Sequence, residues 1–202
     1  MVNNGIDCEQ YTFNETIRAE VRQEFGIGAD DFVIGHVGRF IPLKNQDFLV
    51  DILAELHKTM PSIKLLLVGE GDTMQEVKTK AELAGLKDAV IFTGIRSDVV
   101  RLMQAMDTFV MPSWFEGLPV SLVEAQAAGL PVVASDTISH DSDITGTILF
   151  KSINEPAANW AKCIEEWKEK WGRPDNIEQI KKAGFDSKST VKQLVEIYNG
   201  NV

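Results

Sequence analysis

The sequence predicts an α/β fold, built as a doubly wound (Rossmann-like) parallel sheet of about six strands. Two observations carry this prediction. Short apolar runs suited to buried strands recur along the chain, and stretches whose apolar residues have helical spacing separate them. Glycines follow several of the runs, as in tight turns from strands into helices. No repeat, low-complexity run or linker interrupts the alternation, so residues 1–202 are expected to form one domain.

The first half of the chain shows both patterns clearly. Residues 32–38 form an apolar strand segment, and after them Leu49, Ile52, Leu53 and Leu56 recur at the spacing of a helix that faces a sheet. The elements predicted in this half are helix 16–24, strand 32–38, a helix that ends near residue 59, strand 63–68 and helix 73–84.

The second half repeats the alternation. Residues 120–128 are typical of a helix, with Pro119 near its first turn and Gly129 just past its end. The elements predicted here are strand 90–93, a helix that ends near residue 106, strand 108–111, helix 120–128, strand 131–134, strand 146–150, helix 157–171, a short helical piece after residue 174 and a last helix to residue 198.

Composition narrows the possible partners and location. The chain has 20 Lys and Arg against 30 Asp and Glu, a net charge of −10, which argues against nucleic acid as a partner. Cys8 and Cys163 fit no metal or disulfide spacing, so a reducing cytoplasm is the expected location. No apolar segment is long enough to span a membrane, and the start shows no signal-peptide pattern.

A pair of glutamates lies in the most informative stretch, residues 113–124. Glu116 is predicted in a loop, because Gly117 and Pro119 oppose a helix there, and Glu124 is predicted about one turn inside the following helix. A helix covering that interval would span ~12 Å. Two carboxylates so spaced could each accept hydrogen bonds from a diol of one elongated polyhydroxy ligand, such as a nucleotide sugar. The alternative is that Glu116 only interacts favourably with the positive end of the helix dipole and that Glu124 is a solvated surface residue.

Residues around this pair resemble a known family. Glu116-Gly117-Leu118-Pro119, then Glu124-Ala125 and the Ala-Gly-Leu-Pro-Val-Val-Ala-Ser of residues 128–135 resemble the signature of retaining GT-B glycosyltransferases of family 4. The resemblance implies the C-terminal, donor-binding half of a GT-B fold. It also implies a nucleotide-diphosphate sugar as substrate, expected to be a UDP-sugar, with no cofactor and no metal. The Val-Asn-Asn-Gly-Ile-Asp of residues 2–7 resembles the family's interdomain segment, so the N-terminal acceptor domain is expected to be absent from this chain.

Two cations are candidates for the donor diphosphate. Arg39 follows the strand predicted at 32–38, at the end where ligands bind in open α/β sheets. Lys44 begins the next helix, where a lysine opposes the helix dipole unless an anion is present. In the family a Gly-Arg pair and a following Lys bind the diphosphate of the donor. The resemblance therefore implies this role for Gly38, Arg39 and Lys44. The alternative is a pair of surface cations.

The resemblance also assigns the rest of the donor site. Glu124 is expected to hold the ribose, and Glu116 to position the hexose. Arg39, Lys44 and Glu116 are the expected catalytic residues. Further donor contacts are expected from Gly117, Leu118, Pro119 and Val120, through their backbone, and from Gly94, Ile95 and Arg96, beside the base.

The expected function is donor binding in a retaining, metal-independent glycosyltransferase that transfers a hexose to a glycan or lipid-linked acceptor. The domain alone is expected to be inactive, and any membrane contact, at the inner face, is expected through the missing domain. Two alternatives stay open, a non-catalytic nucleotide-sugar binding module and a GT-B-like epimerase or phosphorylase. Asp141-Ser142-Asp143 has the form of the Asp-x-Asp metal motif of another glycosyltransferase class, but a solvated acidic loop is the favoured interpretation.

Overall fold

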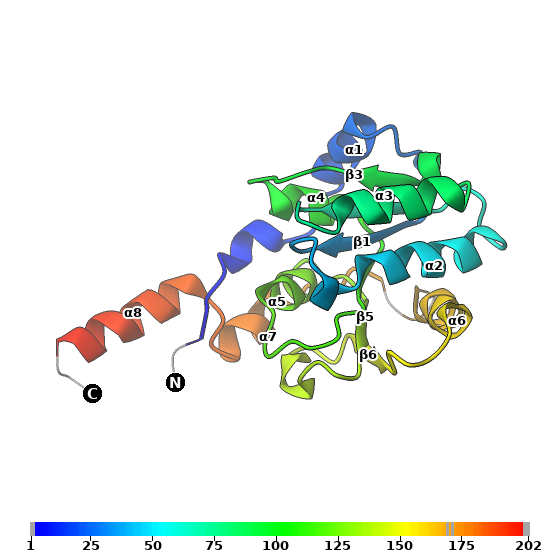
Figure 1. The fold of residues 1–202 in the computed structure, drawn as a ribbon. Helices are drawn as coiled ribbons and strands as arrows, with labels where there is room; N and C mark the ends of the chain where they lie inside the picture. Colours follow the sequence, from blue (N-terminus) through cyan, green and yellow to red (C-terminus); the bar gives the residue numbers. More distant parts are fainter. Residues whose placement is uncertain (1–2, 169, 171, 200–202) are drawn as a thin grey trace.

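The central sheet has six parallel strands in the order β3-β2-β1-β4-β5-β6. A computed structural model describes residues 3–168, 170 and 172–199 of the chain (Figure 1). Every described residue outside the sheet lies in a helix, turn or connecting loop. The predicted α/β fold is therefore confirmed. The strands are β1 (Val33–Val37), β2 (Lys64–Val68), β3 (Val90–Phe92), β4 (Thr108–Met111), β5 (Val132–Ser135) and β6 (Ile148–Lys151).

This strand order creates a topological switch point. From β1 the chain moves outward to β2 and β3, then returns to place β4 on the other side of β1 before continuing to β5 and β6. Because all the strands are parallel, their carboxyl ends lie at one edge of the sheet. In such sheets ligands bind in the crevice outside the carboxyl ends where the order reverses, which is here between β1 and β4.

Helices cover both faces of the sheet, as side chains along each strand alternate between two buried clusters. Along β2, Leu65 and Leu67 join one cluster, whereas Leu66 and Val68 join the other. The first cluster packs under α2 (Gln46–His57), α3 (Met74–Leu83) and α6 (Ala157–Lys168). The second packs under α1 (Glu15–Glu24), α4 (Val99–Ala105), α5 (Val120–Ala127) and α7 (Ile177–Lys182).

The predicted elements are all present, with ends that differ by a few residues. The helix predicted to run to residue 171 is described as far as Lys168, and residues 169 and 171 lie outside the described residues. The predicted helix near residue 174 begins later, at Ile177. Pro174 instead lies in a loop outside any helix or strand, and its carbonyl lies so close to Gly129 that a Cβ at that glycine would clash with it. Gly129 has φ +68°, the left-handed conformation typical of the residue after a helix.

The last helix, α8 (Ser187–Tyr198), projects away from the rest of the domain (Figure 1). Its base is held by the N-terminal segment, because Ile6 N donates to Phe185 O and Ser187 N donates to Ile6 O, both at 2.8 Å. One face of this helix is apolar, and its residues Val191, Val195 and Tyr198 are exposed. Among the described residues nothing covers this face. No described helix combines the length and the apolar character needed to cross a bilayer.

A charged network anchors α1 to the edge of the sheet opposite the carboxyl ends. The Asp107 carboxylate, just before β4, pairs with Arg18 at 2.5 Å and Arg22 at 2.8 Å. It also accepts a hydrogen bond from Val33 N at 2.7 Å, at the start of β1. Arg22 is buried, so its charge depends on this carboxylate and on the carbonyls around it.

We predict that Asp107→Ala lowers the free energy of unfolding by about 3 kcal/mol, because it leaves a buried guanidinium without its counter-charge. Urea denaturation measures the change. Asp88→Ala, which removes an exposed carboxylate, is the control and should change the free energy by less than about 0.5 kcal/mol. An equal, small effect of both variants would contradict a structural role for the network.

Candidate functional site

Two loops meet at the switch point between β1 and β4. After β1 the chain passes into η2 (Pro42–Lys44), and after β4 it runs toward α5. Trp114 N donates to Leu43 O at 2.9 Å, and Asn45 Nδ2 donates to Pro112 O at 3.1 Å. Asn45 has φ +56°, the only positive φ of a described residue other than glycine, and asparagine tolerates that conformation better than most residues. This turn separates η2 from α2 and sets the position of Lys44.

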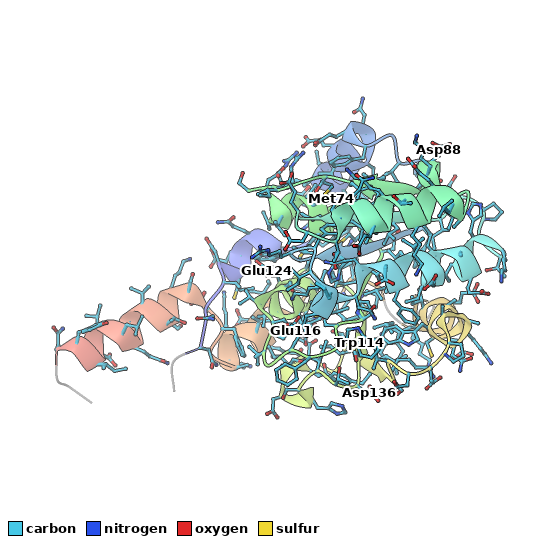
Figure 2. All side chains as sticks on the ribbon, in the orientation of Figure 1. Met74, Asp88, Trp114, Glu116, Glu124 and Asp136 are labelled. Atoms are coloured by element: carbon cyan, nitrogen blue, oxygen red, sulfur yellow. The ribbon has the colours of Figure 1, made fainter. Side chains whose placement is uncertain are left out.

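Lys44 and Glu116 face each other across this crevice. Lys44 Nζ lies 2.6 Å from Glu116 Oε1, and the two side chains are only 17% and 15% exposed. That carboxylate oxygen is buried and accepts no hydrogen bond of favourable geometry, so the ion pair is its one polar contact with the described residues. Figure 2 shows Glu116 beside α5, at the same end of the molecule as Glu124. Lys44, predicted to bind the diphosphate, and Glu116, predicted to position the sugar, are therefore direct neighbours.

Gly38 and Arg39 complete the first loop. A Cβ on Gly38 would be tight against His36 Nε2, at 3.0 Å, and would make ordinary contact with Lys44 Cδ and Cε, at 3.6 Å, so the lysine stem passes over this glycine. Arg39 is exposed, and its guanidinium has no hydrogen-bond or ion-pair partner within the part of the chain that the structure describes. Its carbonyl accepts a hydrogen bond from Gln46 Nε2 at 2.8 Å. Arg39 is thus an unpaired cation on a fixed backbone.

His36 adds no charge to this loop. It is buried in β1 with Nδ1 2.9 Å from Val110 O. Burial lowers the pKa of His36 to about 4, so the ring is neutral at pH 7 and Nδ1 donates to the carbonyl. His36 is therefore an internal residue of the strand.

Glycines bring the neighbouring loops into contact with the first one. A Cβ on Gly69, which has φ +130°, would lie 2.2 Å from Gly38 O, and one on Gly71 would lie 2.2 Å from Phe40 O. Gly69 N donates to Gly94 O at 3.0 Å, and Gly94 also has a positive φ of 71°. No side chain fits at the first two positions. The loops that follow β1, β2 and β3 therefore lie side by side.

The residues after Gly94 differ in exposure. Ile95 is 78% exposed. The Arg96 guanidinium pairs with Asp98 at 2.7 Å and with Glu24 at 2.7 Å, which occupies the side chain in local structure. A contact between Arg96 and a base would therefore use its backbone.

Glu124 has a partner that the sequence did not indicate. The Tyr11 hydroxyl, in η1 (Cys8–Tyr11), donates to Glu124 Oε1 at 2.6 Å. Burial, and then Glu124, raise the pKa of Tyr11, so the hydroxyl stays protonated. Burial raises the pKa of Glu124 as well, and the hydrogen bond from Tyr11 opposes that rise. Glu124 Oε2 has no partner among the described residues and is available to a ligand.

The loop before α5 leaves open space at the site. Gly117 and Leu118 are exposed, Pro119 is buried and Val120 is the first residue of α5. A Cβ on Gly117 would meet no atom within 4 Å. The predicted residues thus fall into two groups. Lys44 and Glu116 are in contact and share their loops with Arg39 and Gly117, whereas Glu124 lies further along α5 and pairs with Tyr11.

The acidic loop at residues 141–143 serves local structure. Asp143 Oδ1 accepts hydrogen bonds from Gly146 N at 2.9 Å and Ile148 N at 3.4 Å. Ser142, which lies between the two aspartates in the sequence, is buried. These contacts fix the turn that leads into β6.

Comparison with known proteins identifies the family. A sequence model of the family described as "Glycosyl transferases group 1" matches residues 17–183. The chain therefore belongs to this family, glycosyltransferase family 4, and its fold is that of the C-terminal domain of GT-B structures. The resemblance inferred from the glutamate motif is confirmed.

Individual relatives show how much of a protein the chain represents. It is 37% identical over 203 residues to the putative glycosyltransferase EpsF of Bacillus subtilis (strain 168), covering 98% of this chain and 53% of EpsF. The structure of HepE from Anabaena in complex with UDP matches with a TM-score of 0.81 and 27% identity, covering 98% of this chain and 57% of HepE. The complex of HepE with UDP-glucose matches with a TM-score of 0.79, 27% identity and the same coverage of both chains. The chain thus spans about half the length of these relatives.

We predict that Glu124→Gln stabilises the domain at neutral pH. Because burial raises the pKa of folded Glu124 above that of the unfolded chain, the ionised carboxylate weakens the fold above the raised pKa. That cost disappears below the pKa of the unfolded carboxyl, at about pH 4. Thermal unfolding should show a higher midpoint for the variant at pH 7, with a difference that shrinks on acidification.

Glu82→Gln, at an exposed position of α3, is the matched control and should show no such pH-dependent difference. A Glu124→Gln variant less stable than the parent at pH 7 would mean that the carboxylate stabilises the fold, contrary to this account.

Proposed function

We propose that the chain is the donor-binding domain of a retaining, metal-independent glycosyltransferase that takes a hexose from a UDP-sugar. The observation that carries the proposal is the position of Arg39, Lys44 and Glu116 around the switch point between β1 and β4, where ligands bind in sheets of this topology. The bound nucleotides of the HepE structures support a UDP-sugar as the donor.

In this proposal Arg39 and Lys44 hold the donor diphosphate. When the bond between the anomeric carbon and the diphosphate oxygen breaks, its electron pair stays with the diphosphate, and the two cations stabilise the charge that develops. Arg39 has no competing partner, whereas Lys44 already pairs with Glu116. The diphosphate would therefore share the ammonium with Glu116 or take it over.

The remaining site residues position the sugar and the nucleoside. Glu116 would accept hydrogen bonds from the hexose, and the open space beside Gly117 would give the sugar room against the backbone of Leu118, Pro119 and Val120. Glu124 would hold the ribose diol through Oε2, while Tyr11 fixes Oε1. Tyr11 is then a positioning residue. The backbone of residues 94–96 would lie beside the base.

Acceptor binding is proposed to require a second domain. The chain spans about half the length of EpsF and HepE, which leaves room in such proteins for an N-terminal, acceptor-binding half. The exposed apolar face of α8 fits contact with such a domain, since in this family the end of the chain crosses back to the first domain. The acceptor is proposed to be a glycan or a lipid-linked molecule, with any membrane contact at the inner face made through the second domain.

Nucleotide titration by calorimetry tests the assigned roles. We expect UDP to bind more tightly than GDP or ADP. Arg39→Ala should weaken UDP binding about tenfold or more, which corresponds to the loss of one charge-assisted hydrogen bond. It should not weaken the binding of uridine, because uridine has no diphosphate. Glu124→Ala should weaken UDP binding and remove the preference for UDP over 2′-deoxy-UDP, because the lost partner is the ribose diol.

Lys58→Ala is the control for loss of a surface cation, since Lys58 caps the C-terminal end of α2, the end far from the crevice, and pairs only with Glu55 among the described residues. It should leave all these affinities unchanged. Equal weakening of UDP and uridine by Arg39→Ala, or an unchanged preference for UDP over 2′-deoxy-UDP in Glu124→Ala, would contradict the assignment.

We also predict that residues 1–202 bind UDP-glucose but transfer no hexose to glycan acceptors. The reason is that the groups proposed to bind and activate the acceptor lie in the second domain. A UDP-release assay measures transfer, with a fusion to the N-terminal half of EpsF as the comparison. Turnover by the chain alone would show that it holds a complete active site.

A further inference from the structure

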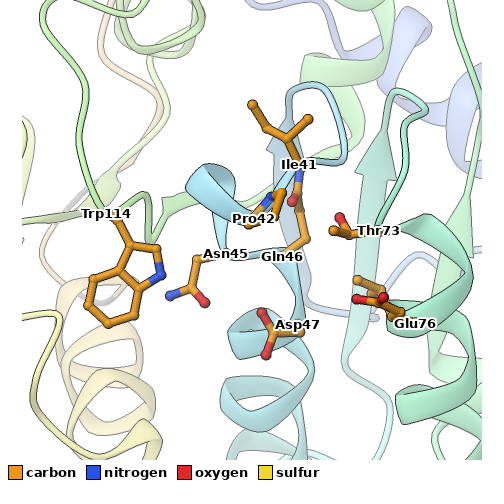
Figure 3. Close-up of a pocket in the computed structure, with 9 residues that line it drawn as sticks. Ile41, Pro42, Asn45, Gln46, Asp47, Thr73, Glu76 and Trp114 are labelled. Carbon is orange, nitrogen blue, oxygen red and sulfur yellow. The ribbon is translucent and has the colours of Figure 1, made fainter.

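A cavity of ≈340 Å³ lies beside the proposed donor site, on the side of the sheet covered by α2 and α3. Figure 3 shows Trp114 on one side of the first turn of α2 and Thr73 and Glu76 on the other, with Asn45 and Asp47 between them. None of Arg39, Lys44, Glu116 and Glu124 lines this cavity. It adjoins the crevice, because Asn45 and Trp114 belong to the two loops that meet there, and we call it the α2–α3 groove.

A buried polar atom in the lining of this groove has no partner. Gln46 is 1% exposed, and its Nε2 donates to Arg39 O at 2.8 Å. Its Oε1 is buried and accepts no hydrogen bond from any described residue. A buried acceptor without a donor is unfavourable, so the position favours a ligand that supplies one.

Other groups in the α2–α3 groove are also free to bind. Asn45 uses Nδ2 on Pro112 O and leaves Oδ1 without a partner. The Thr73 hydroxyl, the Glu76 carboxylate and the Trp114 indole N–H likewise make no hydrogen bond or ion pair with the described part of the chain. Trp114 is 49% exposed and offers much of its ring as a surface. Donors, acceptors and an aromatic ring thus share one hollow.

Charge limits which ligand fits. Asp47 and Glu76 line the groove, and no cation does. Lys80 lies 3.4 Å from Asp47 Oδ2 but is closer, at 2.6 Å, to Asp51, so it only partly offsets the acids. A phosphate would be repelled here, whereas neutral hydroxyl groups donate well to carboxylate and amide oxygens. A sugar ring adds an apolar face that packs on an indole.

We propose that the α2–α3 groove is a binding site for a neutral saccharide, separate from the nucleotide-sugar site. A pyranose ring stacks on Trp114 and its hydroxyl groups donate to Gln46, Asn45 and Glu76. The cavity volume lies at the small end of the range for ligand sites, which suits one or two sugar residues. The proposal does not depend on the roles proposed for Arg39, Lys44, Glu116 or Glu124.

The test is NMR of ¹⁵N-labelled chain titrated with maltotriose, cellotriose and triacetylchitotriose. At least one of these should shift the Trp114 indole signal, with an affinity in the millimolar range, about 1–10 mM. Trp114→Ala should weaken binding about tenfold, and Trp114→Phe should recover part of it because a ring remains. Glu76→Ala should weaken binding about fivefold, whereas Glu82→Ala, on the same helix outside the groove, should not.

Two further measurements separate this site from the donor site and from a folding defect. Saturation with UDP should leave saccharide affinity unchanged, and Trp114→Ala should keep the parent's UDP affinity and unfolding midpoint. The proposal is overturned if no saccharide shifts the indole signal at about 50 mM, well above a millimolar dissociation constant. It is equally overturned if Trp114→Ala binds as well as the parent, or if UDP displaces the saccharide.

Discussion

The ion pair between Lys44 and Glu116 is the contact on which the site depends. It spans the one place where the strand order reverses, and it joins the loop after β1 to the loop after β4. Each side chain is mostly withdrawn from water, so the attraction is screened less than at the surface. The pair holds the lysine in place without a ligand and leaves Arg39 as the unpaired cation. An anion that enters the crevice meets a positioned ammonium and a free guanidinium.

Backbone packing supplies the platform beneath these side chains. Gly69 and Gly71 let the loop after β2 lie against the carbonyls of Gly38 and Phe40, and a hydrogen bond from Gly69 extends the contact to Gly94. The edge is therefore a continuous backbone surface that can approach a ligand closely. Charged and polar side chains are then needed at only a few positions.

Much of this arrangement follows from local sequence patterns. Helical spacing and apolar runs predict the helices and strands. The sequence placed Lys44 at a helix start, whereas Lys44 is the last residue of η2 and α2 begins only at Gln46, after the turn at Asn45. The contact between Tyr11 and Glu124 could not be predicted, because the residues are 113 positions apart and neither lies in a motif for the other. The α2–α3 groove could not be predicted either, because it is tertiary packing that brings Trp114 toward α3. The helix predicted to begin at Pro174 begins only at Ile177, and the Pro174 carbonyl instead lies against Gly129, a contact between residues 45 positions apart.

A crystal structure of the chain with UDP-glucose tests the central claim most directly. The account predicts that the diphosphate lies at the crevice between β1 and β4, with its oxygens at hydrogen-bonding distance, about 3 Å, from both Arg39 and Lys44. It also predicts that Glu116 turns toward the hexose. A diphosphate bound away from this crevice, or one that leaves Lys44 and Glu116 paired and touches neither cation, would contradict it.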